Sequence, residues 1–111
     1  MHKYNAKKTV VDGIKFDSKK EAERYKELKA LEHVGKIERL ELQPRFTLMD
    51  GFRYEGKAVR KIEYVADFLY RDLSTLEFVV EDVKGVKTDV YKLKKKLFLK
   101  HYGNEYKFRE L

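Results

Sequence analysis

Two segments of the chain carry apolar residues at helical spacing, and both have the start and stop signals of helices. In residues 17–35 the apolar positions follow one helix face, and Ser18 with Glu21 matches a capping box. In residues 88–103 Thr88 is the candidate cap, and the apolar positions again gather on one side. Each segment ends at a glycine, the residue that most often terminates a helix. The sequence therefore predicts two amphipathic helices.

The other apolar residues alternate with polar ones or form short runs of β-branched and aromatic residues, which predicts strands. An Asp-Gly pair in the middle of the first of these segments favours a tight hairpin turn. Pro44 interrupts a long extended segment, so we expect the chain to bend there. Residues 50–57 supply turn residues, with aromatics that suggest continued strand. The predicted strand segments are 9–16 (the hairpin), 36–49, 60–72, 76–85 and 105–111.

The predicted order is hairpin, helix, three antiparallel strands, helix and strand. A meander followed by a helical crossover predicts an α/β fold with a central mixed β-sheet flanked by helices. The chain has 111 residues with a single proline, six scattered glycines and no internal repeat. We therefore expect one domain spanning residues 1–111.

Charge narrows the candidate partners. The chain has 26 basic and 19 acidic residues, a net charge of +7, which favours a polyanion: nucleic acid first, an anionic membrane surface second. Plain solubility is the alternative explanation. No cysteine is present, which excludes thiolate chemistry and disulfides. No apolar run approaches the roughly 20 residues of a membrane span, and the N-terminus lacks an apolar signal stretch. We expect a cytoplasmic protein with no membrane partner.

Three carboxylates and a lysine are the candidate chemical groups. Asp67 lies in the apolar strand "YVADFLY", where aspartate is disfavoured unless it is paired or binds a metal. If the next strand returns through a hairpin about residues 73–75, Asp67 falls within a residue of the position opposite Asp82. Glu21 faces along the apolar side of its helix. Such oxygen ligands suit Mg²⁺ or Mn²⁺, and Lys84 could stabilise developing negative charge or position a water.

Each of these residues also has a structural interpretation. Glu21 can serve only as part of the capping box, a role compatible with a place in the site. Asp82 and Lys84 point to the same face of a strand and can form an ordinary surface ion pair. Glu81 could replace Asp82 as a ligand, although strand alternation groups it with the apolar residues and favours Asp82.

A basic segment follows the acidic residues. Lysines on one side of the second predicted helix could contact successive phosphates of a DNA backbone. The alternative is an ordinary helix face exposed to solvent. No helix-turn-helix or zinc-finger pattern is present, so we expect recognition of backbone and shape rather than sequence. The candidate DNA-binding residues are Lys87, Lys92, Lys94, Lys95, Lys96 and Lys100. The tyrosines that could stack on unpaired bases, or instead pack in the core, are Tyr54, Tyr64, Tyr70 and Tyr91.

The order Glu21, Asp67, then Asp82-Val83-Lys84 resembles the PD-(D/E)XK nuclease superfamily, as does the predicted order of helices and strands. More narrowly, "FDSKKEAERYKEL", "LELQPRFTL", "YVADFLY" and "VVEDVKG" resemble a small phage-encoded family of that superfamily. The resemblance covers almost the whole chain. Ala66 stands where the motif's name expects proline, a position at which the proline is often replaced.

The resemblance implies a restriction-endonuclease-like core and a Mg²⁺- or Mn²⁺-dependent DNA endonuclease. Asp67 and Asp82 would bind the metal, Lys84 would assist the attacking water, and Glu21 would be the helix-borne acid. Glu41 and Gln43 also resemble family-typical residues, without an assigned role.

Small size and the lack of a specificity domain favour a structure-selective enzyme acting on branched DNA. Resolution of Holliday junctions in phage DNA metabolism, inside the host cytoplasm, would require a homodimer. The alternative is a non-catalytic nucleic-acid-binding or protein-adaptor module on a nuclease fold.

Overall fold

The chain begins with a hairpin and a capped helix, as its sequence predicts. A computed structural model describes residues 8–111. Strands β1 (Thr9–Val11) and β2 (Ile14–Phe16) pair through a turn in which Asp12 and Gly13 both have positive φ angles. Helix α1 (Lys19–His33) follows, and the Ser18 Oγ accepts the backbone N–H of Glu21 at 3.1 Å. The predicted N-terminal cap of α1 is therefore confirmed.

A four-stranded mixed sheet forms the centre of the molecule. Its strand order is β10-β9-β8-β3, with β3 and β9 antiparallel to β8 and with β10 parallel to β9. These strands span Ile37–Leu42 (β3), Phe68–Asp72 (β8), Phe78–Asp82 (β9) and Tyr106–Glu110 (β10). The parallel pair is joined through helix α2 (Asp89–Tyr102), which Thr88 caps at 3.1 Å. The fold is thus mixed α/β, as expected.

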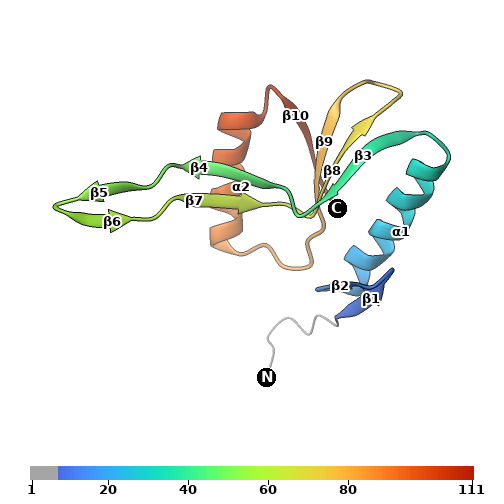
Figure 1. Ribbon diagram of the computed structural model, residues 1–111, viewed down its shortest axis with the longest axis horizontal. Coiled ribbons are helices and arrows are strands. Elements are labelled where there is room, and N and C mark those ends of the chain that lie inside the picture. Colours follow the sequence, from blue (N-terminus) through green and yellow to red (C-terminus); the bar gives the residue numbers. More distant parts are fainter. Residues whose placement is uncertain (1–7) are drawn as a thin grey trace.

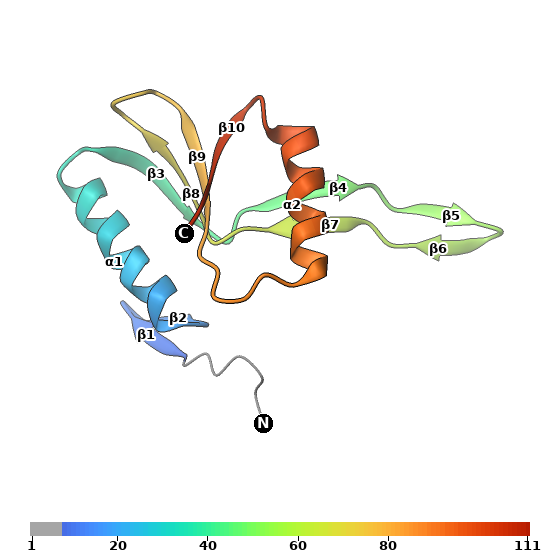
Figure 2. The ribbon, with the colours of Figure 1, turned by 180° about the vertical axis from the view of Figure 1, so that it is seen from behind.

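The two helices cover opposite faces of this sheet (Figures 1 and 2). Along β8 and β9 successive side chains alternate between the faces. Phe68 and Val79 pack with Leu28 of α1, whereas Val80 packs with Phe98 of α2. The sheet therefore divides the apolar core into two clusters. Neither helix of residues 8–111 is long and apolar enough to cross a lipid bilayer.

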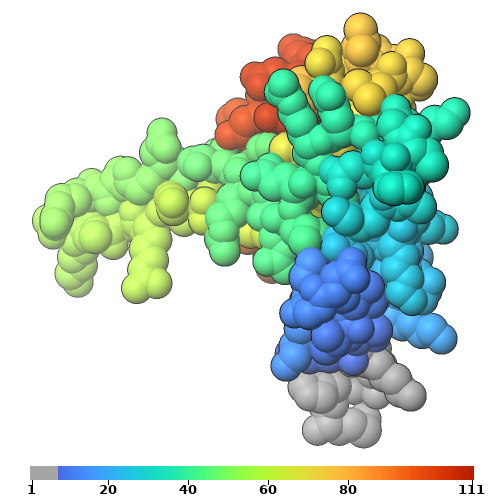
Figure 3. Space-filling view, turned by 45° about the vertical axis from the view of Figure 1, so that its right-hand side comes forward, coloured from blue at the N-terminus to red at the C-terminus, as the bar shows by residue number. Residues whose placement is uncertain are grey.

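A long two-stranded arm, residues 45–65, projects from the body (Figures 1 and 3). It consists of β4 (Arg45–Met49), β5 (Phe52–Tyr54), β6 (Lys57–Val59) and β7 (Ile62–Val65). β4 pairs with β7 near the body, and β5 pairs with β6 towards the tip.

The arm corrects the predicted strand boundaries. The segments expected as continuous strands at 36–49 and 60–72 each break in two, and their inner pieces belong to the arm. Gln43, with φ of 50°, and Pro44 make the first break, where the bend was expected. Ala66 and Asp67 make the second, which no proline or glycine signals. The three predicted antiparallel strands of the sheet are β3, β8 and β9.

Candidate functional site

Asp67 and Asp82 lie side by side where β8 begins and β9 ends. The register pairs Phe68 with Glu81, so one further step brings Asp67 level with Asp82. Asp67 Oδ2 accepts the backbone N–H of Val83 at 2.6 Å, which fixes one carboxylate against the other strand. Asp82 is only 1% exposed. The closeness expected from the sequence is found, with a register one residue different from a hairpin centred on residue 74.

Lys84 and Tyr64 hold the carboxylate of Asp82. Lys84 Nζ lies 3.1 Å from Asp82 Oδ1 and 4.3 Å from the ring centroid of Tyr91. The Tyr64 hydroxyl donates a hydrogen bond to Asp82 Oδ2. Asp82 Oδ1 is buried and has the ion pair to Lys84 but no partner in hydrogen-bond geometry. Asp82 is therefore oriented by an arm residue and retains an oxygen with unused acceptor capacity.

Glu21 contributes the third carboxylate from the first turn of α1. Its side chain is buried, and its backbone N–H is the group that Ser18 caps. In the described part of the chain the Glu21 carboxylate makes no return bond to Ser18, so the box is only half formed. The carboxylate instead lies close enough to Asp67 and Asp82 to interact with both of them. Ser18 therefore provides the cap, and the Glu21 side chain belongs to the acidic cluster.

The three carboxylates of Glu21, Asp67 and Asp82 carry more negative charge than nearby cations neutralise. Burial raises the pKa of Asp67 to about 8, and the charges of Asp82 and Glu21 add to this effect against the hydrogen bond from Val83. Burial also raises the pKa of Glu21, helped by Asp17 and Asp82. Lys84 is the cation paired with Asp82, and its charge also acts on Glu21. The site is thus suited to take up a proton or a cation.

The donor set fits Mg²⁺ or Mn²⁺ in its chemistry. Carboxylate oxygens are the ligands these ions prefer, and Asp82 Oδ1 has a free lone pair next to Asp67. Within residues 8–111 no three His, Cys, Asp or Glu side chains already surround one point closely enough to hold an ion. Asp67 and Asp82 could hold the ion, and the Glu21 carboxylate lies beside them.

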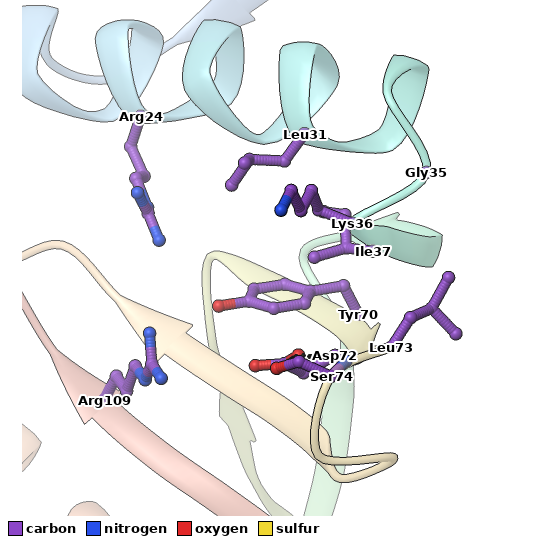
Figure 4. Close-up of a pocket in the computed structure, with 10 residues that line it drawn as sticks. All are labelled: Arg24, Leu31, Gly35, Lys36, Ile37, Tyr70, Asp72, Leu73, Ser74 and Arg109. Carbon is purple, nitrogen blue, oxygen red and sulfur yellow. Dashed lines mark hydrogen bonds between the residues drawn. The ribbon is translucent and has the colours of Figure 1, made fainter.

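Glu81, the alternative ligand, belongs to a separate network on the α1 face of the sheet. It is completely buried, and Arg24 binds both its carboxylate oxygens at 2.7 and 2.6 Å. Tyr70 donates a further hydrogen bond to it. A hollow of about 390 Å³ lies next to this network, and Figure 4 shows the residues that line it. Arg24 and Arg109 lie on either side of the Tyr70 hydroxyl. Because its oxygens are already satisfied, Glu81 has a structural role.

The candidate DNA-binding lysines divide into two groups. Lys87, Lys92, Lys95 and Lys96 line a hollow of about 350 Å³ together with Glu110, whereas Lys94 and Lys100 do not line it.

Sequence reasoning missed the role of Glu110 in this basic surface. Glu110 binds Lys87 at 2.8 Å and Lys95 at 3.2 Å and accepts the Tyr91 hydroxyl at 2.5 Å. Lys87, followed by Tyr91 and Lys95, lowers the pKa of Glu110 to about 2. Lys92 and Lys96 have no ion pair in the described chain and are the cations available to a phosphate.

Three of the four tyrosines considered for base stacking are buried, and one is exposed. Tyr64, Tyr70 and Tyr91 are buried in the two core clusters, and their hydroxyls bind carboxylates. Tyr54 is 64% exposed near the end of the arm, so a place in the core is wrong for it. A buried tyrosine generally needs a hydroxyl partner, and this rule was the one signal that could have linked Tyr64 to a nearby acid.

Glu41 and Gln43 precede the arm, and Gln43 acts through its main chain. The backbone N–H of Gln43 donates to the Asp67 carbonyl at 2.9 Å, so Gln43 supports the backbone of the site. The side chains of Glu41 and Gln43 are exposed.

Comparison with known proteins identifies a family but no activity. A family model described as "Protein of unknown function (DUF1064)" matches residues 1–110, and the chain belongs to this family. No curated protein and no solved structure matches the chain.

Proposed function

We propose that this member of the DUF1064 family is a Mg²⁺- or Mn²⁺-dependent DNA endonuclease of the PD-(D/E)XK type. One observation carries the proposal: Asp67 and Asp82 adjoin at the ends of two paired strands, with Lys84 Nζ 3.1 Å from Asp82. A purely structural ion pair needs one acid and one base. Burial of a second and a third carboxylate against the first is costly, and binding a cation would offset that cost.

Each side chain has a role in phosphodiester hydrolysis. When bound, the metal ion would neutralise charge on the scissile phosphate and make a water more acidic. Asp67 and Asp82 would hold the ion, and Tyr64 would keep Asp82 in position through its hydrogen bond. Lys84 would orient the attacking water and stabilise the charge that develops on the phosphate as the P–O bond to the leaving group breaks. Glu21 would accept a proton from the water.

The arrangement of elements supports the same assignment. Without the arm and the N-terminal hairpin, the order is helix, three antiparallel strands, helix and a strand parallel to the third. This order is similar to the common core of restriction-endonuclease-like enzymes. The basic hollow on α2 lies beside Tyr91, which Lys84 contacts, so a phosphate backbone could pass from the lysines to the acids. A homodimer acting on branched DNA stays part of the proposal.

Cleavage of labelled DNA tests the proposal directly. Duplex, flap and four-way-junction substrates would be incubated with Mg²⁺, Mn²⁺ or EDTA. We expect metal-dependent cutting that Asp67→Asn and Lys84→Ala abolish. The matched controls Asp72→Asn and Lys15→Ala change exposed or turn residues outside the site and should cut normally. Tight binding without cutting in any metal would instead favour the adaptor.

The basic surface has its own test. Replacing both Lys92 and Lys96 by Ala should weaken DNA binding and reduce the slope of log affinity against log salt concentration by roughly 2, about 0.9 for each phosphate that is no longer neutralised. Lys15→Ala is the control and should leave the slope unchanged. An unchanged slope in the double variant would remove this face from the DNA path.

A further inference from the structure

The end of the arm exposes a hydrophobic surface without support from the body. We call residues 50–62 the arm tip. All three residues of β5 are exposed, with Phe52 51% and Tyr54 64% accessible. An isolated two-stranded hairpin is at best marginally stable in water, and large exposed aromatics in a cluster commonly mark an interaction site. The arm tip is therefore suited to contact another molecule.

Strand pairing sorts the side chains of the arm tip. Phe52 pairs with Val59 and Tyr54 pairs with Lys57, so these four residues share one face. Two aromatic rings thus stand beside a cation on a surface that projects into solvent (Figure 3).

The charge of the arm tip indicates which kind of molecule binds to it. The arm tip contains four basic residues and two acidic ones, a net charge of +2, and the whole chain carries +7. A second copy of the same arm would bring like charge. Lys57 and Arg60 have no ion pair within residues 8–111. Exposed rings interleaved with free cations complement the base faces and phosphates of a nucleic acid.

The arm is also tied to the acidic site. Where it leaves the body, the Ala66 N–H donates to the Pro44 carbonyl at 3.1 Å, and the Gln43 N–H donates to the Asp67 carbonyl at 2.9 Å. Each arm strand runs about ten residues to the tip, or roughly 30 Å at a rise of about 3.3 Å per residue. This distance is close to one turn of a DNA duplex, about 34 Å.

We propose that the arm tip binds DNA by stacking Phe52 and Tyr54 on unpaired bases while Lys57 and Arg60 contact phosphates. The inference rests on the proposed function in taking DNA as the ligand. It adds the substrate class: DNA with unpaired or branch-point bases about one helical turn from the bond that is cut.

A single fluorescent residue tests the contact without any cleavage. The chain contains no tryptophan, so Tyr54→Trp introduces one reporter at the arm tip. In EDTA we expect its emission to be quenched by flap or junction DNA and much less by fully paired duplex. Val34→Trp, at the 66% exposed C-cap of α1, is the matched control and should stay unquenched. Equal quenching of both reporters, or of neither by DNA that binds, overturns the inference.

Affinity gives an independent measurement. Replacing both Phe52 and Tyr54 by Ala should weaken binding of branched DNA by roughly thirtyfold or more, because each stacked base that is lost costs about fivefold to a hundredfold in affinity. The paired substitution Val10→Ala with Val34→Ala should have no effect. Because the altered rings are exposed, the melting temperature should stay unchanged.

The possible failures are distinguishable. If the wild type cuts DNA but the arm-tip variant binds and cuts equally well, this inference fails and the proposed function stands. If the tip reporter is quenched but no metal supports cutting, the inference stands and the nuclease fails. If the variant loses self-association with unchanged DNA affinity, the arm joins two copies of the chain and the inference is overturned.

Discussion

Asp67→Asn should make the protein more stable at neutral and alkaline pH while removing its response to Mg²⁺. The substitution keeps the size of the side chain and an oxygen that can accept the N–H of Val83, but it removes the charge. The pKa of Asp67 is raised from 3.8 to about 8 by burial and by Asp82. The folded protein therefore holds this proton more tightly than the unfolded chain. Its contribution to the free energy of unfolding is complete below about pH 4 and is lost as pH rises towards 8.

The size of the effect follows from that difference. One pKa unit corresponds to about 1.4 kcal/mol, so a difference of about four units sets an upper limit of roughly 5–6 kcal/mol. Asp67 is only half-buried, and screening and side-chain relaxation reduce this limit substantially. We expect Asp67→Asn to raise the free energy of unfolding by about 2 kcal/mol at pH 8, or the melting temperature by about 8 °C, and to change neither at pH 4.

Thermal or urea unfolding in EDTA at several pH values measures this directly. Asp72→Asn is the control with opposite sign, because hydrogen bonds from Ser74 lower the pKa of Asp72. Relative to the wild type it should be less stable by a constant amount above about pH 4, with the difference disappearing at lower pH, whereas the gain of Asp67→Asn should grow from pH 4 to pH 8. Adding Mg²⁺ should then stabilise the wild type but not Asp67→Asn. A variant that is no more stable than the wild type at pH 8, or that gains as much from Mg²⁺, would refute the reasoning.

Three further predictions concern neighbouring side chains. Lys84→Ala should abolish cutting but weaken DNA binding in EDTA by less than about threefold, as filter binding would show, because one phosphate contact contributes little. Arg24→Leu leaves Glu81 buried and unpaired and should cost about 3–5 kcal/mol in urea unfolding, most of it recovered by adding Glu81→Leu. Ser18→Ala should cost about 1 kcal/mol of stability with unchanged Mg²⁺ affinity, whereas Glu21→Gln should weaken Mg²⁺ binding in calorimetry; unchanged Mg²⁺ binding in Glu21→Gln would remove Glu21 from the site.

Local signals in the sequence carried most of the secondary structure. Ser18 and Thr88 mark helix starts because a hydroxyl satisfies a free N–H wherever the helix lies in the fold. The Asp-Gly pair at 12–13 marks a hairpin because both residues tolerate positive φ. The closeness of Asp67 and Asp82 also followed from the sequence, since a short turn between two strands leaves few registers.

What the sequence could not reveal depends on contacts between distant segments. The arm was missed because the break at Ala66 and Asp67 is imposed by hydrogen bonds to Pro44 and Gln43, more than 20 residues earlier. Glu110 joins Lys87 and Lys95 only because β10 pairs in parallel with β9, a register that no local pattern encodes. The metal, the substrate and the dimer stay predictions until they are measured.

Strand β10 lies at the edge of the sheet beside β9, and this position also affects when the site can form during synthesis. β9 is made with β8 already present, but its other neighbour, residues 106–110, comes after the whole of α2. Two bonds then flank the motif: Leu111 N–H to the Asp82 carbonyl at 2.9 Å, and Lys84 N–H to the Leu111 carbonyl at 3.0 Å. Until residues 106–111 have left the ribosome, one side of Asp82 and Lys84 has no backbone partner. A nascent chain that lacks β10 would therefore carry its acids in a loose arrangement, and the ordered geometry would arise only when β10 pairs with β9.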